Sequence, residues 1–248
     1  MQKPPKSIII LFITFTLFQN NSFAEKVKDK NIEFLQNKLN EIIPNYKFDR
    51  IKKSPLENIY EIVYGGEIIY ITADAKFIFE SGNLQKIIKE EGAYSFINLT
   101  ESSAAEGRKN LLASLPDSKF FVYGKENNKE KYINVVTDID CPYCRKFHND
   151  INFYIENGIK VRYLVFAIKT SSKKRVISAW CADDKNDAFT LLKKEQKIEI
   201  NNCTNPIEEH QNIISSIGVS STPSIFLPDG KLIQGYMSPE EVIKKIEN

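Results

Sequence analysis

A Cys-x-x-Cys pair directly after a β-branched run constrains this chain more than any other feature of its sequence. Residues 132–136 (YINVV) have the composition of a buried strand, and residues 141–144 (CPYC) follow a few positions later. Apolar side chains then recur at helical spacing, at Phe147, Ile151 and Tyr154. The pattern predicts a strand followed by a dithiol in the first turn of a helix.

The expected position of Cys141 is the N-cap of that helix, with Pro142 at the first helical position, where no N–H is needed. The unpaired backbone N–H groups of the first turn would then point at the Cys141 sulfur and stabilise its thiolate. Cysteines in such places have pKa values of about 3.5 to 7.5 instead of about 8.5. We therefore expect Cys141 to be the nucleophile and Cys144, one turn deeper, to be the resolving thiol that attacks a mixed disulfide on Cys141.

Two other interpretations of the Cys-x-x-Cys pair are disfavoured. A zinc site needs further ligands, but the other two cysteines, Cys181 and Cys203, are far apart in the sequence. A purely structural disulfide between Cys141 and Cys144 would close a very small loop and remove little chain entropy. We expect a redox-active dithiol that needs neither a metal ion nor another cofactor.

Residues 1–24 have the arrangement of a secretory signal peptide. Lys3 and Lys6 precede an apolar run of 11 residues at 8–18, and the ending Ser-Phe-Ala at 22–24 predicts cleavage after residue 24. A helix that spans a bilayer needs about 20 apolar residues, so an uncleaved anchor is disfavoured. We therefore expect an exported protein, and export from the cytosol allows disulfides to persist.

The charge balance argues against a nucleic-acid partner. The full chain has a net charge of +2, and loss of the two lysines of residues 1–24 leaves 34 − 2 = 32 basic residues and 32 acidic residues. A nucleic-acid-binding domain typically has a basic stripe or patch, whereas lysine-rich segments in a neutral chain are expected on solvated faces. The 248 − 24 = 224 remaining residues favour two domains.

Residues 25–99 are expected to form an α+β dimerisation domain. Residues 30–43 predict an amphipathic helix that Pro44 ends, and strands are expected at 46–51, 58–64, 67–72 and 76–80, with a hairpin turn at Gly65-Gly66. Residues 84–89 favour a helical turn and residues 94–99 a strand. A unit of this size has a thin core, so it would gain stability by pairing with a second copy.

A linker helix is expected at residues 100–116, followed by an α/β catalytic domain at 117–248. This domain is predicted to contain an edge strand at 119–123, the central strand, a helix from Cys141 to about Asn157, and a parallel strand at 159–167. It continues with a helical insertion at 171–200, a helix from Asn205 to near Gly218, a hairpin at 224–227 and 232–235, and a last helix after Ser238.

Thr222-Pro223 directly precedes the strand expected at 224–227. A proline is tolerated there because the first residue of a strand need not donate to the ladder, and only about one X-Pro bond in twenty is cis. Beside a dithiol on a βαβ unit, however, a cis-Pro223 would expose the Thr222 backbone as a short edge. A substrate chain could pair with this edge next to Cys141.

Cys181 and Cys203 fall within the predicted helical insertion and the segment that follows it. A bond between them would close a loop of about 22 residues and contribute about 3 kcal/mol in the chain-entropy model. Pairing either of them with Cys141 or Cys144 would leave an odd thiol in each half of the domain. We therefore expect a structural Cys181–Cys203 disulfide.

Taken together, these segments resemble the DsbC/DsbG family of periplasmic disulfide isomerases. In the catalytic half the resemblance rests on TDIDCPYC, VRYLVFA, AWCADDKNDAF, the lone Cys203, GVSSTPSIFLPDG and a later GY; NIYEIVYGGEIIYITADAKFIFE resembles that family's N-terminal domain. The resemblance implies an α/β thioredoxin-like fold for residues 117–248, a location in the periplasm, a V-shaped homodimer and a cis-Pro223. It assigns Cys141 as the nucleophile, Cys144 as the resolving thiol and Cys181–Cys203 as a structural bond. It also implies misfolded, disulfide-containing exported proteins as clients and a membrane thiol reductase of the DsbD type as partner.

The residues around the dithiol depart from the DsbC branch of that family. Pro142-Tyr143 resembles the DsbG branch, and Arg145 stands where the DsbC branch has histidine. An anion at Asp140 would raise the pKa of Cys141 and a cation at Arg145 would lower it, so the sequence leaves the direction of the shift open.

The two histidines are given smaller roles. His148, one turn after Cys144, could shuttle a proton or tune the sulfur, but a packed or solvated side chain is the favoured interpretation. His210 lies in a predicted amphipathic helix and is expected on the surface.

The leading hypothesis for function is a thiol–disulfide isomerase or reductase that acts through Cys141 and Cys144. Three alternatives remain open at this point: a DsbA-like dithiol oxidase, a chaperone that binds unfolded chains between two subunits, and a DsbG-like reductase of sulfenylated cysteines.

Overall fold

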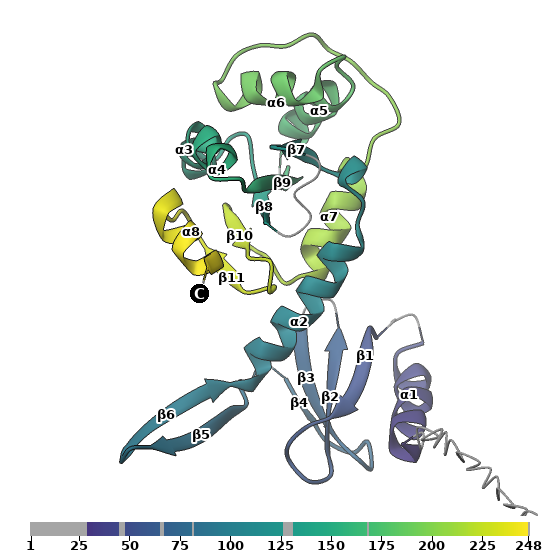
Figure 1. Ribbon diagram of the computed structural model, residues 1–248. Helices are drawn as coiled ribbons and strands as arrows, with labels where there is room; N and C mark the ends of the chain where they lie inside the picture. The colour runs from purple at the N-terminus through teal and green to yellow at the C-terminus, as the bar shows by residue number, and fades with distance from the viewer. Residues whose placement is uncertain are drawn as a thin grey trace, which may run out of the picture.

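The computed structural model describes residues 29–44, 48–64, 67–80, 82–125, 131–167 and 169–247. The expected signal peptide at 1–24 and the expected turn at Gly65-Gly66 lie outside these ranges. Figure 1 shows two lobes joined by a single long helix, α2 (Leu99–Ser114). Within the described ranges, no helix combines the length and the apolar character that a membrane span requires.

The N-terminal lobe packs one helix on a four-stranded antiparallel sheet. The elements are α1 (Lys30–Ile42), β1 (Arg50–Lys53), β2 (Ile59–Tyr64), β3 (Glu67–Thr72) and β4 (Ile78–Phe79), and the strands follow each other in the sheet in sequence order. The Asp29 side chain caps α1 by accepting from the Asn31 N–H at 3.0 Å. Leu35 and Leu39 of α1, both fully buried, meet Tyr60, Ile62 and Ile71 of the sheet.

A separate two-stranded hairpin, β5 (Gln85–Glu90) with β6 (Ala93–Asn98), projects away from both lobes (Figure 1). The helical turn expected at residues 84–89 is therefore wrong. Glu91 and Gly92 form a two-residue turn in which both φ angles are positive, 50° and 87°, and this conformation matches the twist of a hairpin. Most side chains of both strands are exposed.

The linker helix α2 belongs to the cores of both lobes. Ala104 packs with the N-terminal sheet, whereas Leu112 packs with the catalytic lobe. Near the middle of the helix, the buried Arg108 donates from Nε to the carbonyl oxygen of Gly230 at 3.0 Å. Gly230 has φ +86°, and a Cβ built there would lie 1.9 Å from the Ala105 oxygen. The close approach of α2 therefore requires glycine at this turn.

The catalytic lobe is organised around a five-stranded mixed sheet of order β11-β10-β8-β9-β7. The strands are β7 (Phe121–Tyr123), β8 (Tyr132–Thr137), β9 (Lys160–Val165), β10 (Ser224–Phe226) and β11 (Leu232–Gln234). Only β8 and β9 are parallel among these described strands, and β8 has the central place that its β-branched sequence predicts. The edge strand expected at 119–123 is shorter, because Asp117–Lys119 form a 3-10 helix.

The helix expected from Cys141 to about Asn157 is divided into α3 (Pro142–Asn149) and α4 (Ile151–Glu156). Asp150 separates the two helices, because its backbone (φ −89°, ψ 7°) is the C-cap of α3 and the N-cap of α4. Its carboxylate accepts a hydrogen bond from the Tyr236 hydroxyl at 3.0 Å. Gly158, with φ +74°, follows α4 as expected.

The remaining helices are α5 (Thr170–Trp180), α6 (Lys185–Lys193), α7 (Ile207–Ser216) and α8 (Pro239–Glu247). The insertion expected at 171–200 thus consists of two helices. The second begins at Lys185 because the Asp184 side chain caps it by accepting from the N–H groups of Asn186 and Asp187, and it ends at Lys193. The capping box of Ser238 and Glu241 is present at the start of α8.

His210 is buried, so its expected surface position is wrong. The Val165 N–H donates to Nδ1 at 3.1 Å, and Nε2 lies 2.6 Å from the Lys119 carbonyl oxygen, to which it donates. The ring thereby satisfies two backbone groups that β9 and the 3-10 helix leave without a partner in the interior. Burial lowers the pKa of His210 to about 4, so the ring is neutral at physiological pH.

Candidate active site

The structure brings Cys141 together with the Thr222-Pro223 segment, 81 residues later in the chain. Cys141 is the N-cap of α3, with Pro142 at the first helical position. Its thiol donates to the Thr222 carbonyl oxygen, with sulfur and oxygen 3.4 Å apart. The Thr222-Pro223 peptide bond is cis, as the family resemblance implies.

Sheet register explains why these two segments meet. Ser224 of β10 is opposite Val136 of β8 in an antiparallel pair, so the residues before β10 lie beside the residues after β8. Pro223 is buried, and its carbonyl oxygen accepts from the Gly235 N–H at 2.8 Å, which fixes the proline at the start of the strand. Thr222 is half-buried beside the sulfur.

The environment of the Cys141 sulfur lowers its pKa. Partial burial raises the pKa, but the backbone N–H groups of Cys144 and Tyr143 and the side chains of Cys144 and Thr222 together outweigh burial. The physical cause is the one expected at a helix start, where N–H groups without a helical partner favour a negative charge. A lowered pKa raises the fraction of thiolate, which is the nucleophilic form of cysteine.

The second sulfur of the motif has the opposite environment. Cys144 is fully buried, and its sulfur accepts from the Asp138 N–H at 3.4 Å. Burial raises the pKa of the Cys144 thiol, although Lys193, Thr222, Asp138 and Thr137 act in the other direction. Both cysteines are free thiols, so the pair consists of a partly exposed thiol with a lowered pKa and a buried thiol with a raised pKa.

Asp140 and Arg145 each have partners of their own. The Asp140 carboxylate accepts from the Ser172 hydroxyl and forms a 2.6 Å ion pair with Arg175 of α5. Partial burial raises the pKa of Asp140, but these two hydrogen bonds leave it lowered. Arg145 forms a 3.1 Å ion pair with Glu195. The direction of the Cys141 pKa shift, which the sequence left open, is therefore set mainly by the N–H groups of the helix start and by the side chains of Cys144 and Thr222.

Tyr143 and His148 lie on opposite sides of α3. Tyr143 is 62% exposed, so its ring is available to a bound chain next to Cys141. His148 is buried, with Nδ1 3.1 Å from the Tyr163 hydroxyl and Nε2 3.1 Å from the Thr190 hydroxyl. Burial, assisted by the Lys193 charge, lowers the pKa of His148 to about 3. His148 is thus a neutral packing residue, which is the interpretation that the sequence favours.

Lys193 is the residue of this region that sequence reasoning missed. It is the last residue of α6, it is 2% exposed, and its ammonium group donates to the Thr137 hydroxyl and, at 2.9 Å, to the Asp138 carbonyl oxygen. The one available signal was its spacing, because Lys193 follows Phe189 by four residues on the apolar face of the predicted helix.

The Cys181–Cys203 disulfide is present, with a Cα–Cα distance of 5.7 Å. Cys181 caps the C-terminus of α5, so the bond ties this helix to the irregular segment between α6 and α7. The adjacent Trp180 packs edge-to-face on Phe121 with the ring centroids 4.9 Å apart. The disulfide thus fixes the outer layer of the catalytic lobe and is separate from the dithiol.

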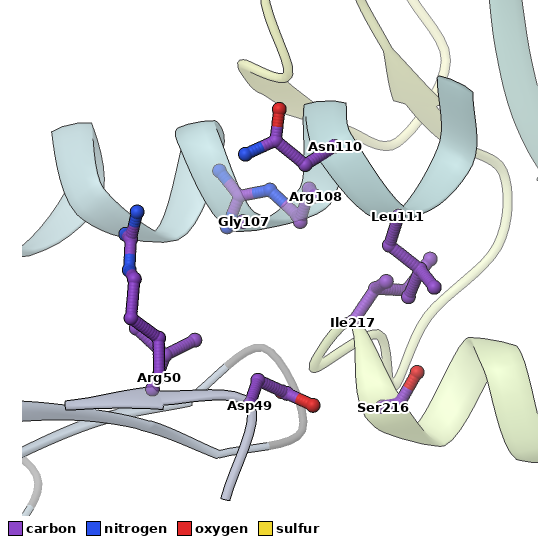
Figure 2. Close-up of a pocket in the computed structure, with 9 residues that line it drawn as sticks. Asp49, Arg50, Gly107, Arg108, Asn110, Leu111, Ser216 and Ile217 are labelled. Atoms are coloured by element: carbon purple, nitrogen blue, oxygen red, sulfur yellow. The ribbon is translucent and has the colours of Figure 1, made fainter. Parts of the chain in front are cut away.

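A cavity of about 300 Å³ lies away from the dithiol, at the joint between the two lobes. Figure 2 shows Asp49 and Arg50 of the N-terminal lobe on one side, with α2 and the end of α7 on the others. Its lining contains neither a cysteine nor a histidine, and Arg50 is already paired with Glu106 at 3.1 Å. None of the candidate site residues lines this cavity.

Two family models match the chain, one for each lobe. Residues 21–101 match the "Disulfide bond isomerase protein N-terminal domain", and residues 122–248 match the "Thioredoxin-like domain". The two matched ranges agree with the two lobes that α2 joins.

Curated relatives match along most of the chain. The thiol:disulfide interchange protein DsbC of Escherichia coli (strain K12) is 29% identical over 236 residues, 93% of this chain and 92% of that protein. The protein of the same name from Salmonella typhimurium is 31% identical over 197 residues, 77% of this chain and 78% of that protein.

Among solved structures, a disulfide interchange protein from Neisseria gonorrhoeae matches with a TM-score of 0.48 and 21% identity, over 54% of this chain and 99% of that one. The family models and the curated relatives place both lobes in one family. The chain therefore belongs to the DsbC/DsbG family of disulfide isomerases and is a thiol–disulfide oxidoreductase.

Proposed function

We propose that this protein isomerises or reduces non-native disulfides in exported proteins, with Cys141 as the nucleophile. The Cys141 thiolate attacks one sulfur of a client disulfide, a Cys141–client disulfide forms, and the other client sulfur leaves as a thiolate that takes up a proton. The freed client thiol can attack another disulfide of the client and finally displace Cys141, which is isomerisation. Alternatively, Cys144 displaces the client, which leaves the client reduced and the Cys141–Cys144 pair oxidised.

The observation that carries this proposal is the contrast between the two sulfurs. Cys141 is partly exposed with a lowered pKa, whereas Cys144 is fully buried with a raised pKa. A protonated resolving thiol reacts slowly, since only the thiolate is nucleophilic. The mixed disulfide therefore persists long enough for a client to rearrange, as isomerisation requires.

Client binding is assigned to the Thr222-Pro223 segment and to Tyr143. The cis peptide bond leaves the Thr222 backbone at the surface beside the Cys141 sulfur, where an extended client chain can pair with it. Such main-chain pairing accepts many sequences, which suits an enzyme that acts on unrelated misfolded proteins.

Homodimerisation is assigned to the projecting β5–β6 hairpin and the neighbouring strand β4. Four apolar side chains in this region are each 63 to 65% exposed: Phe77 directly before β4, and Ile87, Tyr94 and Phe96 on the hairpin. A two-stranded hairpin is marginally stable in water by itself, so a second copy that covers these apolar side chains would stabilise it.

The protein is proposed to act in the periplasm after removal of residues 1–24, and to use no cofactor beyond its own dithiol. Each reductive turnover leaves Cys141 and Cys144 oxidised, so the enzyme needs a source of electrons. A membrane thiol reductase of the DsbD type is the proposed partner that restores the dithiol.

The test is recovery of ribonuclease activity from scrambled, fully oxidised ribonuclease in a glutathione buffer. We expect the mature protein to accelerate recovery and Cys141→Ala to abolish it. Cys144→Ala should instead accumulate a mixed disulfide with the client, detectable on a non-reducing gel. No acceleration by the mature protein, with an established isomerase active in parallel, would contradict the proposal. Trapping of the thiols in cells separates a reduced isomerase from an oxidised DsbA-like oxidase.

A further inference from the structure

Lys193 brings a positive charge into the interior beneath the dithiol. Its side chain is 2% exposed, and it reaches this place from the end of α6, a helix that packs against α3. A buried ammonium group is costly unless a negative charge or several hydrogen bonds compensate for it. The position of Lys193 therefore calls for a compensating group.

Both hydrogen-bond partners of the Lys193 ammonium group within the described ranges are formally neutral. They are the Thr137 hydroxyl and the Asp138 carbonyl oxygen, at the end of β8. The same two residues act on the buried thiol of Cys144. The Asp138 N–H donates to its sulfur, and a hydrogen bond with the Thr137 side chain lowers its pKa. Lys193 and Cys144 thus contact the same short segment, Thr137–Asp138.

We propose that Lys193 is a positioning residue whose buried ammonium group stabilises the Cys144 thiolate when this sulfur displaces a client from Cys141. The inference rests on the proposed function and extends it, because it assigns to one side chain the rate at which mixed disulfides are resolved. Resolution competes with rearrangement of the client, so Lys193 would set the balance between reduction and isomerisation.

The Cys144 thiolate attacks the Cys141 sulfur, the Cys141–Cys144 bond forms, and the bond between Cys141 and the client sulfur breaks with its electron pair on the client. The Cys144 proton ends on the departing client thiolate. The dithiol is oxidised by two electrons and the client disulfide is reduced by two. Lys193 takes no part in bond making, and its charge stabilises the sulfur anion through the Thr137–Asp138 segment.

The titration of the two groups agrees with this geometry. Burial lowers the pKa of Lys193 to about 8, and Cys144 is the largest influence in the opposite direction. Reciprocally, Lys193 is the largest influence that lowers the pKa of Cys144 against burial. The other titratable groups that face Lys193 are Asp138 directly after β8, Cys141 at the N-cap of α3, Arg145 and His148 within α3, and Tyr163 on β9, whose ring centroid lies 5.8 Å from Nζ.

The test separates the two sulfurs in a single experiment with dithiobis(nitrobenzoate), a chromogenic aryl disulfide. Reduced protein releases one coloured thiolate when Cys141 attacks the reagent, at a rate proportional to reagent concentration. It releases a second when Cys144 resolves the adduct, at a rate independent of that concentration. The variants are Lys193→Met, which removes charge and donors, Lys193→Gln, which keeps an N–H donor without charge, and the exposed neighbour Lys194→Met as a matched control.

We expect both Lys193 variants to slow the second release about tenfold at neutral pH and to move its pH midpoint upward by about one unit, since one unit corresponds to a factor of ten. Lys194→Met should match the parent protein, and the first release should change less than about twofold in all variants. An unchanged second release and midpoint in Lys193→Met and Lys193→Gln would overturn the inference. Absence of the first release from the parent protein would instead overturn the proposed function.

A measurement without a Lys193 substitution covers the case in which these variants do not fold. In Cys141→Ser protein, nuclear magnetic resonance follows the Lys193 Cε and Cys144 Cβ signals as pH is raised. We expect the Lys193 signal to show an inflection at the pH where Cys144 ionises. A Lys193 signal that does not respond to Cys144 ionisation would show that the charges are not coupled and would refute the inference.

Discussion

Substitution of Gly230 by alanine tests how the linker helix is held on the catalytic lobe. Gly230 lies in the turn between β10 and β11, with φ +86°, against the middle of α2. A Cβ at this position would lie 1.9 Å from the Ala105 oxygen, 2.8 Å from the Ala105 carbonyl carbon and 2.9 Å from the Lys109 nitrogen. All three are backbone atoms of a helix, so no side-chain rotation can relieve the contact.

The expected cost has two parts. Alanine at a positive φ costs about 1 kcal/mol in backbone strain. The overlap then forces α2 away from the turn, which breaks the 3.0 Å hydrogen bond from the buried Arg108 to the Gly230 oxygen. A hydrogen bond to a charged group contributes about 1.5 to 3 kcal/mol. We therefore expect Gly230→Ala to lower the free energy of unfolding by about 2.5 to 4 kcal/mol.

Gly235→Ala is a matched control. Gly235 has nearly the same backbone conformation, with φ +83°, but a Cβ there would have no atom within 4 Å. Only the strain of about 1 kcal/mol should remain in this variant. The difference between the two variants, about 1.5 to 3 kcal/mol, then measures the contact between α2 and the catalytic lobe.

Urea unfolding followed by tryptophan fluorescence provides the measurement. The chain has one tryptophan, Trp180, which lies in the catalytic lobe. Small-angle X-ray scattering of both variants should detect a change in the arrangement of the lobes only for Gly230→Ala. If Gly230→Ala and Gly235→Ala were equally stable and scattered alike, the conclusion that α2 is fixed at Gly230 would be refuted.

Three further predictions follow from the same contacts. Removal of the Cys181–Cys203 bond in a double alanine variant should lower the free energy of unfolding by about 3 kcal/mol in the chain-entropy model, because the bonded cysteines are 22 residues apart. Urea unfolding followed by Trp180 fluorescence measures this loss. A loss below about 1 kcal/mol would contradict the prediction. The chain has two histidines, and both are buried with lowered pKa values, about 3 for His148 and about 4 for His210. Histidine in an unfolded chain titrates near pH 6.5, so below that pH the unfolded chain binds more protons than the folded chain. The free energy of unfolding should therefore fall with falling pH, by up to about 1.4 kcal/mol per pH unit for each histidine. His148→Gln should reduce the slope of the free energy of unfolding against pH. Finally, Phe96→Glu on the hairpin should convert a dimer to a monomer in sedimentation experiments, whereas Phe153→Glu on α4, a residue 37% exposed in the other lobe, should not.

Local sequence signals were sufficient for most elements of the catalytic lobe. The β-branched run of β8, the proline after Cys141 and the capping box at Ser238 each act through neighbours within a few residues, and each element is present. The Cys181–Cys203 disulfide could be predicted because only four cysteines are available and two of them form a close pair.

The secondary structure predicted from the sequence is wrong where the local preference for helix or strand is weak and a neighbouring backbone turn is decisive. Residues 85–90 lack a clear helical or strand period, and the Glu91-Gly92 turn with two positive φ angles decides for a strand. At Asp150, the backbone conformation and the hydrogen bond from Tyr236, 86 residues later, divide a helix that its apolar spacing predicts to be continuous.

The sequence by itself determined that a dithiol lies at the junction of a buried strand and a helix, because that arrangement depends on adjacent residues. Only the tertiary structure decided the direction of the Cys141 pKa shift, the burial of His210 and the approach of Lys193 to the end of β8. These depend on contacts between residues far apart in the chain, such as Lys193 with Thr137, 56 residues earlier. Desolvation and charge act through space, so their sign is fixed only when the packing is known.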